Sequence, residues 1–105
     1  MTAVSFLPDA EEEMIESARY YESNCERLGS DFLSEVDRAI KSIQAHPTAA
    51  PVIGSNIRRR LLDRFPFGLL YTIENNDVLI LAVMHLRRRP GYWKERLGRT
   101  EKGAL

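Results

Sequence analysis

Residues 58–93 decide the fold, and they read RRRLLDRFPFGLLYTIENNDVLILAVMHLRRRPGYW. Two runs of apolar, β-branched and aromatic residues, 67–73 and 78–84, flank a Glu-Asn-Asn-Asp turn, which is the pattern of a β-hairpin. The second run contains no polar residue, so we expect this strand to be covered on both faces in the middle of a sheet. An arginine triplet stands at each outer end of the hairpin. The rest of the chain is expected to pack around it.

The composition is that of an ordinary soluble globular domain. With 105 residues, of which 44% are hydrophobic and 29% charged, the chain can build one core. No segment reaches the roughly 18 apolar residues of a membrane span, and no signal-peptide pattern opens the sequence. The single Cys25 excludes an internal disulfide and a cysteine-rich metal site. We therefore expect a cytoplasmic protein with one domain over residues 1–97 and a tail over 98–105.

The net charge of zero hides an asymmetry between the two halves of the chain. Up to Ser55 there are four basic and ten acidic residues, whereas from Asn56 onward there are eleven basic and five acidic ones. The second half is therefore suited to a polyanionic or acidic partner. Alternatively, the two halves attract each other, and both interpretations can hold together.

The first half predicts a strand and two helices. A short apolar stretch at 3–7 suits a first strand. Apolar residues at spacings of three and four predict a helix over 9–28, with Glu11 to Glu13 as its solvated start and Gly29 as its C-terminal stop. Ser30 then caps a second helix that ends before Pro47. With so short a connection the helices form an antiparallel hairpin whose apolar stripes face the sheet.

The second half predicts the remaining strands. Residues 47–55 are expected to be a loop, 57–62 a strand, 65–68 a bend before the hairpin, and 91–97 a short helix. The order β-α-α-β-β-β-short α indicates the α+β class: a small, mainly antiparallel sheet with an N-terminal helical hairpin packed on one face. The opposite face remains available for function.

Arginine and aromatic side chains are the candidate binding residues. Guanidinium groups bind phosphates or carboxylates bidentately, and aromatic rings stack on bases or anchor interfaces. Because the ends of neighbouring strands lie close together, we expect these side chains on one exposed rim. The candidate target-binding residues are Arg58, Arg60, Arg64, Arg87, Arg88, Arg89, Tyr92 and Trp93. The alternative is that the triplets are solvated strand ends, and for Trp93 and Phe67 we favour a place in the core.

The two histidines have ordinary interpretations beside catalytic ones. His85 is either a general acid or base, since its ordinary pKa lies near neutrality, or a hydrogen-bonded residue at a strand end. His46 suits the C-terminal dipole of the second helix. The sequence contains no glycine-rich phosphate loop, paired carboxylates or metal-ligand spacing, so no cofactor or metal is expected.

An ordered set of motifs over residues 4–97 resembles the RelE/ParE superfamily of toxins from bacterial type II toxin–antitoxin systems. The motifs are Phe6-x-Pro8-x-Ala10, Tyr20-Tyr21-Glu22, Leu28-Gly29-x-x-Phe32, Arg59-Arg60, Arg64-Phe65-Pro66-Phe67-Gly68, Tyr71 and Ala82-Val83-x-His85-x-x-Arg88-x-Pro90-x-Tyr92-Trp93. This resemblance implies the α+β fold described above. It also implies an antitoxin partner, a segment of which wraps and masks the toxin.

The superfamily contains two activities. ParE-like members bind and poison DNA gyrase without chemistry of their own, whereas RelE-like members are metal-independent mRNA endonucleases that work on the ribosome. For a nuclease the resemblance implies Arg60, His85, Arg87 and Tyr92 as catalytic residues, but Gly68 occupies a position where such nucleases place an arginine. The resemblance favours a ParE-like toxin. A ribosome-dependent mRNA endonuclease is the alternative, and a diverged nucleic-acid-binding module is a third.

Overall fold

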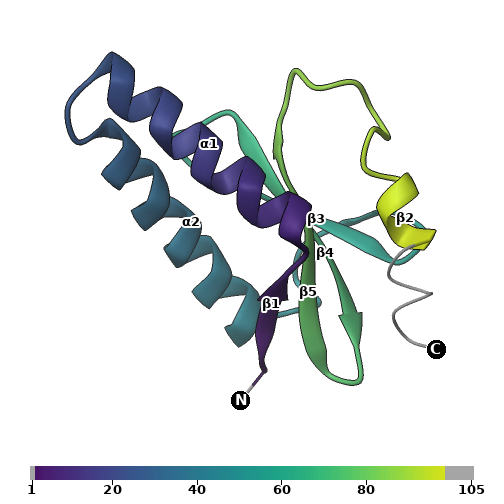
Figure 1. The fold of residues 1–105 in the computed structure, drawn as a ribbon. Coiled ribbons are helices and arrows are strands. Elements are labelled where there is room, and N and C mark those ends of the chain that lie inside the picture. The colour runs from purple at the N-terminus through teal and green to yellow at the C-terminus, as the bar shows by residue number, and fades with distance from the viewer. Residues whose placement is uncertain (1, 99–105) are drawn as a thin grey trace.

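The computed structural model describes residues 2–98. Its elements are β1 (Val4–Phe6), α1 (Pro8–Asn24), α2 (Leu28–Ala45), β2 (Val52–Gly54), β3 (Ile57–Leu61), β4 (Phe67–Glu74) and β5 (Asp77–His85). Residues 95–98 are also helical. The strands form one sheet in the order β1-β5-β4-β3-β2, in which β1 and β5 are parallel and the other pairs antiparallel. The two helices lie side by side on one face (Figure 1), so the expected α+β class is confirmed.

The β4–β5 hairpin is the one that the sequence predicts. Glu74 pairs with Asp77, and Asn75 and Asn76 between them have φ values of 51° and 69°. Two left-handed residues form a tight turn whose twist matches that of the strands, and asparagine tolerates this conformation. Strand β5 lies between β1 and β4, so its expected central position is also confirmed.

A β-bulge in this hairpin changes which side chains of β5 face the helices. Leu70 pairs with Ala82 but Tyr71 pairs with Ile80, so Leu81 is an extra residue in β5. The extra residue reverses the alternation of side chains along the strand. Ile80 and Val83 therefore contact the helix-side core, whereas Leu81 and Ala82 belong to a cluster on the opposite face.

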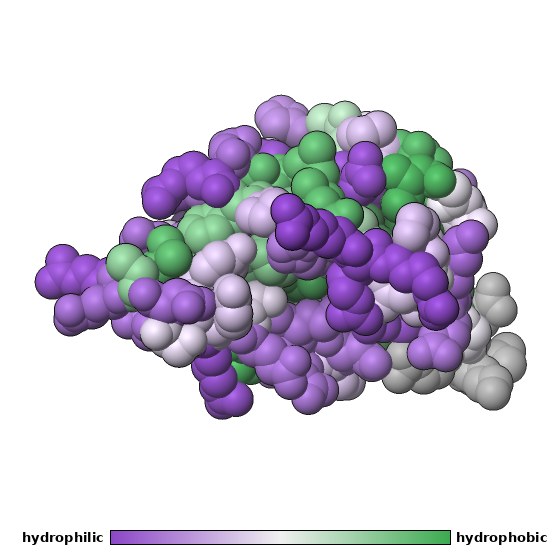
Figure 2. All heavy atoms as spheres, turned by 90° about the horizontal axis from the view of Figure 1, so that it is seen from above, coloured by the Kyte–Doolittle hydropathy of each residue, from purple (hydrophilic) through white to green (hydrophobic). Residues whose placement is uncertain are grey.

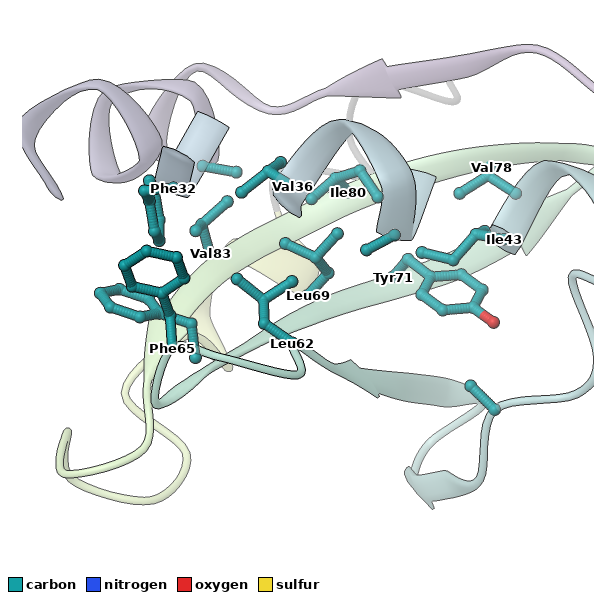
Figure 3. Close-up of a cluster of buried hydrophobic side chains, with 14 of the residues drawn as sticks. Phe32, Val36, Ile43, Leu62, Phe65, Leu69, Tyr71, Val78, Ile80 and Val83 are labelled. Atoms are coloured by element: carbon teal, nitrogen blue, oxygen red, sulfur yellow. The ribbon is translucent and has the colours of Figure 1, made fainter. Parts of the chain in front are cut away.

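The helix-side core combines α2 with β4 and β5. Figure 3 shows Phe32, Val36 and Ile43 lying over Leu69 and Tyr71. Aromatic rings close one end of this core, with the Phe32 ring centroid 4.9 Å from that of Phe67 and 5.3 Å from that of Phe65. Such edge-on contacts add specificity to apolar burial. Phe67 is 4% exposed, which confirms its expected place in the core.

The connection between the helices differs from the prediction. Helix α1 ends at Asn24 instead of residue 28, and α2 begins at Leu28, so Gly29 and Ser30 lie in its first turn. Arg27 takes the left-handed conformation with φ 72°. The Glu22 carboxylate accepts the backbone N–H groups of Arg27 and Gly29, each at 3.0 Å, so α1 caps α2 in place of the expected Ser30.

Two further expectations need correction. The predicted loop 47–55 contains the edge strand β2, which pairs with β3 through a tight turn at Ser55 and Asn56, both with positive φ. The predicted helix 91–97 is mostly turns, with helical residues only at 95–98 in the described chain. Apart from Gly98, the predicted tail lies outside the described residues. No helix among residues 2–98 has the length and apolar character that crossing a bilayer requires.

A buried carboxylate holds the bend between β3 and β4 against α2. Glu35 is 4% exposed, and one of its oxygens accepts the backbone N–H of Arg64 at 2.6 Å while the other accepts Arg38 at 3.1 Å. Burial by itself raises the pKa of Glu35, but the N–H groups of Arg64 and Asp63 and the Arg38 guanidinium outweigh it, so the pKa is lowered from its ordinary value.

We expect Gly29→Ala to destabilise the fold by about 1–3 kcal/mol, the usual cost of overpacking. A Cβ at this position would lie 2.4 Å from the Ala18 carbonyl oxygen and 2.9 Å from the Glu22 Cβ, so the helices would have to separate. Urea unfolding followed by circular dichroism measures the difference. Gly98→Ala is the control, because its Cβ meets nothing within 4 Å among the described atoms. Equal stabilities of the two variants would contradict this account of the helix contact.

We expect Glu35→Gln to lower the free energy of unfolding by about 1–3 kcal/mol at pH 7, because a charged acceptor of buried N–H groups is lost. A pKa lowered by folding makes this contribution complete above the ordinary carboxylate value of about 4.3 and removes it as pH falls through the folded-state value. The difference in free energy of unfolding between wild type and variant should therefore become smaller below about pH 4. Urea unfolding at several pH values tests this, with exposed Glu12→Gln as control. A gap that is constant with pH would refute the role of the charge.

Candidate functional site

The pleat of β3 sends the first arginine triplet to different faces of the sheet. Arg58 and Arg60 pair with Tyr71 and Leu69, which belong to the helix-side core, so their side chains leave on that side. Arg59 pairs with Leu70 of the opposite cluster and leaves on the other side. The sequence predicts one common rim, and this division is a correction to it.

The guanidinium groups of Arg58 and Arg60 donate hydrogen bonds to backbone carbonyl oxygens. The Arg58 guanidinium donates to the oxygens of Thr48 and Ala50 at 2.9 and 2.7 Å, which holds the loop before β2 against β3. Arg60 donates to the carbonyl oxygen of Leu61. Arg58 therefore has a role in the fold, because it ties this loop to the sheet.

Arg59 lies in a groove on the face away from the helices. The groove has a volume of about 420 Å³. We call it the basic groove, and it is lined by Ile53, Arg59, Leu61, Met84, Leu86, Arg88, Pro90, Gly91, Trp93 and Lys94. Strands β2, β3 and β5 and the residues after β5 all contribute to it. Of the three cations, Arg88 is a candidate target-binding residue from the sequence, Arg59 belongs to the Arg59-Arg60 motif of the resemblance, and Lys94 is an addition from the structure.

The cations of the basic groove have no carboxylate partner among residues 2–98. None of the ion pairs within the described chain involves Arg59, Arg88 or Lys94. The Nε of Arg59 is inaccessible to solvent and lacks a hydrogen-bond partner. A buried donor without an acceptor costs free energy, so this Nε destabilises the fold. The unpaired positive charges of the groove are a separate feature. This arrangement is suited to binding an acidic or polyanionic partner.

Apolar side chains are exposed around these cations. Ile53, Leu61 and Leu86 are 40%, 43% and 45% exposed, which is unusual for aliphatic residues grouped around one groove. Viewed from above, green apolar side chains lie between strongly hydrophilic purple ones (Figure 2). The surface therefore combines charge with apolar contact area, as protein interfaces do.

The second arginine triplet follows β5 in an exposed loop. Arg87, Arg88 and Arg89 are all exposed, and the Arg88 guanidinium stacks 3.9 Å from the centre of the Tyr92 ring. The N–H of Leu86 donates to the Pro66 carbonyl oxygen at 2.9 Å, so this loop touches the bend before β4.

Arg64 lies in that bend, on the side of α2. Its guanidinium is 3.8 Å from a carboxylate oxygen of Asp31 and 5.7 Å from the centre of the Phe65 ring. Arg64 is thus near the triplet loop but outside the lining of the basic groove.

The two candidate aromatic residues are largely enclosed. Trp93 is 6% exposed and packs with Ile57, Leu81 and Met84 over the face away from the helices. It forms the floor of the basic groove and is not a projecting ring, which agrees with the core position that the sequence favours. This face is therefore partly covered, which corrects the prediction that it remains available for function.

Tyr92 is half-buried, and its hydroxyl donates to Glu13 at 2.6 Å. Burial and this hydrogen bond raise the pKa of Tyr92 above its ordinary value. Glu13 is a residue that sequence reasoning missed, since the sequence predicts it as part of a solvated helix start. Arg96 was missed as well, and it is 7% exposed in contact with Glu13. No local signal connects two residues 83 positions apart.

His85 ends β5 beside the triplet loop. Its Nδ1 accepts the backbone N–H of Arg87 at 3.0 Å, so a neutral ring carries its proton on Nε2. The ring lies edge-on to Phe67, with centroids 5.0 Å apart. Of the residues implied for a nuclease, His85 and Arg87 are neighbours, but Arg60 leaves on the helix side and Tyr92 packs on the other. Within residues 2–98, no three histidine, cysteine or carboxylate side chains gather as metal ligands.

Solved structures with a similar fold come from toxin–antitoxin systems. The chromosomal ParDE system from P. aeruginosa aligns with a TM-score of 0.59 at 14% identity, covering 81% of this chain and 96% of that one. The YoeB–YefM complex from Staphylococcus aureus gives 0.50 at 18% identity, covering 79% and 94%, and the YoeB dimer from the same organism gives 0.51 at 17%, covering 78% and 93%. At these identities the likeness shows the fold alone.

The sequence itself supplies the family. A comparison with curated proteins gives no match. The family model described as the ParE toxin of the type II toxin–antitoxin system, parDE, matches residues 4–90, from β1 to the end of the second arginine triplet and the proline after it. Because this match spans most of a chain that also has the fold of such toxins, the chain belongs to the ParE toxin family of type II toxin–antitoxin systems.

Proposed function

We propose that this toxin acts in the cytoplasm by binding DNA gyrase and poisoning it, and that a cognate antitoxin neutralises it. The basic groove carries this proposal. Its cations Arg59, Arg88 and Lys94 lack carboxylate partners in the described chain and stand among exposed apolar side chains. ParE-like toxins act on gyrase. The family membership and the Arg-Phe-Pro-Phe-Gly bend favour a ParE-like activity for this chain.

The geometry supports binding more than chemistry. Cleavage of RNA by its own 2′-hydroxyl requires activation of that hydroxyl and charge neutralisation at one phosphate. The Tyr92 hydroxyl is held by Glu13, and its raised pKa makes it a weak acid. Arg60 leaves on the other side of the sheet. These residues do not converge on one scissile bond.

One observation favours the RelE-like alternative, a ribosome-dependent mRNA endonuclease. His85 keeps Nε2 for proton transfer because its Nδ1 is hydrogen-bonded, and Arg87 follows it in an exposed loop. A histidine can transfer a proton, and an arginine beside it can neutralise charge on a phosphate. The two functions are separated by their effects in cells.

The antitoxin is proposed to contribute an acidic, partly apolar segment. The solved relatives include a ParDE system and a YoeB–YefM complex, so proteins of this fold assemble with antitoxins. Carboxylates on such a segment would pair with the cations of the basic groove, which have no carboxylate partner within residues 2–98. Masking of the basic groove would then prevent target binding.

We expect Arg87→Ala with Arg89→Ala to abolish toxicity while the fold persists, because both side chains are exposed and make no intramolecular ion pair within residues 2–98. The test is induction without antitoxin, with viability, gyrase-linked DNA breaks and the SOS response as readouts. Arg19→Ala with Lys41→Ala removes the same charge from the helices and is the control. Translation arrest with mRNA cut at the ribosomal A site would sink the gyrase proposal. Full toxicity of a folded double variant would show that target binding does not use Arg87 and Arg89, which stand beside the basic groove and do not line it.

We expect Arg59→Met to weaken gyrase inhibition by about tenfold or more, since a desolvated charge at the centre of an interface is lost. The same variant should unfold at the same or slightly higher urea concentration than wild type, because the unpartnered Nε disappears while the alkyl chain against Gly68 is kept. Supercoiling inhibition and urea unfolding measure the two quantities. A loss of stability in parallel with activity would show that Arg59 serves the fold instead.

A further inference from the structure

The carboxylate of Glu13 is fully occupied by four donors. Its Oε1 accepts Nη1 of Arg96 at 2.9 Å and the backbone N–H of Val83 at 3.1 Å, and its Oε2 accepts Nη2 of Arg96 at 3.0 Å and the hydroxyl of Tyr92 at 2.6 Å. The pairing with Arg96 is bidentate, the most directional geometry available to these groups. We call Glu13, Tyr92 and Arg96 the carboxylate latch. It joins α1 to the residues after the arginine loop.

The carboxylate latch lies beside the part of β5 that extends beyond its pairing with β1. Strand β1 pairs only with residues 78–80 of β5, and the N–H of Leu7 makes the last contact, to the carbonyl of Ile80. At the bulge that follows, Arg96 donates to the carbonyl oxygen of Leu81 at 2.9 Å, and Glu13 accepts from Val83. Two side chains thus satisfy backbone groups of β5 that β1 no longer reaches. An unsatisfied buried backbone group would destabilise the sheet, so the Leu81 carbonyl needs a donor and the Val83 N–H needs an acceptor.

Because the carboxylate latch is buried, it fixes the position of the chain more than it adds to the free energy of unfolding. The side chains of Arg96 and Glu13 are only 9% and 16% exposed. Desolvation offsets much of the attraction in such a pair, and the loss of one partner leaves a buried charge. A carboxylate oxygen of Asp9 lies 3.9 Å from Nε of Arg96 and adds negative potential. An arrangement of this kind fixes the position of a segment.

The segment held in this way, residues 90–98, forms one wall and the floor of the basic groove. Trp93 and Lys94 line the groove directly. The ring of Tyr92, whose hydroxyl is held by Glu13, is the surface on which the Arg88 guanidinium stacks at 3.9 Å. A chain of contacts therefore leads from Glu13 on α1 through Tyr92 to Arg88, whereas Glu13 and Arg96 do not line the groove.

We propose that Glu13 and Arg96 are positioning residues, which hold residues 90–98 against β5 and thereby set the places of Arg88 and Lys94 in the basic groove. The role in target binding rests on the proposed function of the groove. The holding of the segment does not, and it can be measured in the isolated protein. Removal of the latch frees the segment locally, while the helix-side core has its own contacts and persists.

The test uses Trp93, the only tryptophan of the chain, as the reporter. Glu13→Gln keeps the shape of the side chain but removes its charge, and the control is Glu12→Gln at an exposed position. We expect Glu13→Gln to shift Trp93 emission to the red and to raise its quenching by iodide severalfold at temperatures where helix circular dichroism is unchanged. Amide exchange should accelerate at Val83 and in 92–96 but not in the centre of β4. Arg96→Lys, which keeps charge without the bidentate fork, should give a smaller change in the same direction.

Each outcome supports or overturns the positioning role of Glu13 and Arg96. Unchanged quenching and exchange in folded Glu13→Gln and Arg96→Lys would overturn the inference, and if Glu13→Gln fails to fold, Arg96→Lys decides alone. With an active wild type, we expect Glu13→Gln to inhibit gyrase about tenfold less well, as for a displaced interface contact. Full inhibition despite a freed segment would overturn the positioning role. A wild type that does not inhibit gyrase would refute the proposed target but leave the quenching result intact.

Discussion

Strand β5 is buried on both faces, and this burial constrains the rest of the structure. Its side chains divide between the helix-side core, with Val78, Ile80 and Val83, and the opposite cluster, with Leu81 and Met84. Each such side chain is worth roughly 1.5–3 kcal/mol when removed from water, so both faces need a cover. The helical hairpin covers one face. The residues after the second arginine triplet must cover the other, which brings a cationic part of the chain onto the sheet.

Three carboxylates of the helical hairpin act as acceptors for backbone groups of other segments. Glu22 accepts the N–H groups that begin α2, Glu35 accepts that of Arg64 in the bend before β4, and Glu13 accepts that of Val83 at the bulge. Carboxylates of the acidic half therefore stabilise the fold. In addition, Glu13 and Asp31 each contact an arginine of the basic half. The attraction between the halves and the suitability for an acidic partner hold together, because different arginines serve the two purposes.

The pleat of a strand separates those purposes. In β3 the side chains of Arg58 and Arg60 leave towards the helices and bind carbonyl oxygens, whereas Arg59 between them enters the basic groove. A triplet of identical residues thus places cations on the two faces of the sheet in alternation. The loop after β5 has no such constraint, and all three of its arginines are exposed.

The sequence by itself determined the α+β class, the β4–β5 hairpin and the interior place of β5, because these follow from local periodicity and turn chemistry. It also predicted the core positions of Phe67 and Trp93, because large aromatic residues are rarely exposed. The motifs along the chain indicated the toxin superfamily for the same reason, since they are read in order. Only the tertiary structure decided where the helices meet, that β2 exists, that Glu13 pairs with Arg96, and which arginines line the basic groove. Those features depend on contacts such as Gly29 against Ala18 and Glu13 against Arg96, between residues far apart in the chain. No periodicity records such contacts, because they arise from the packing of complete elements.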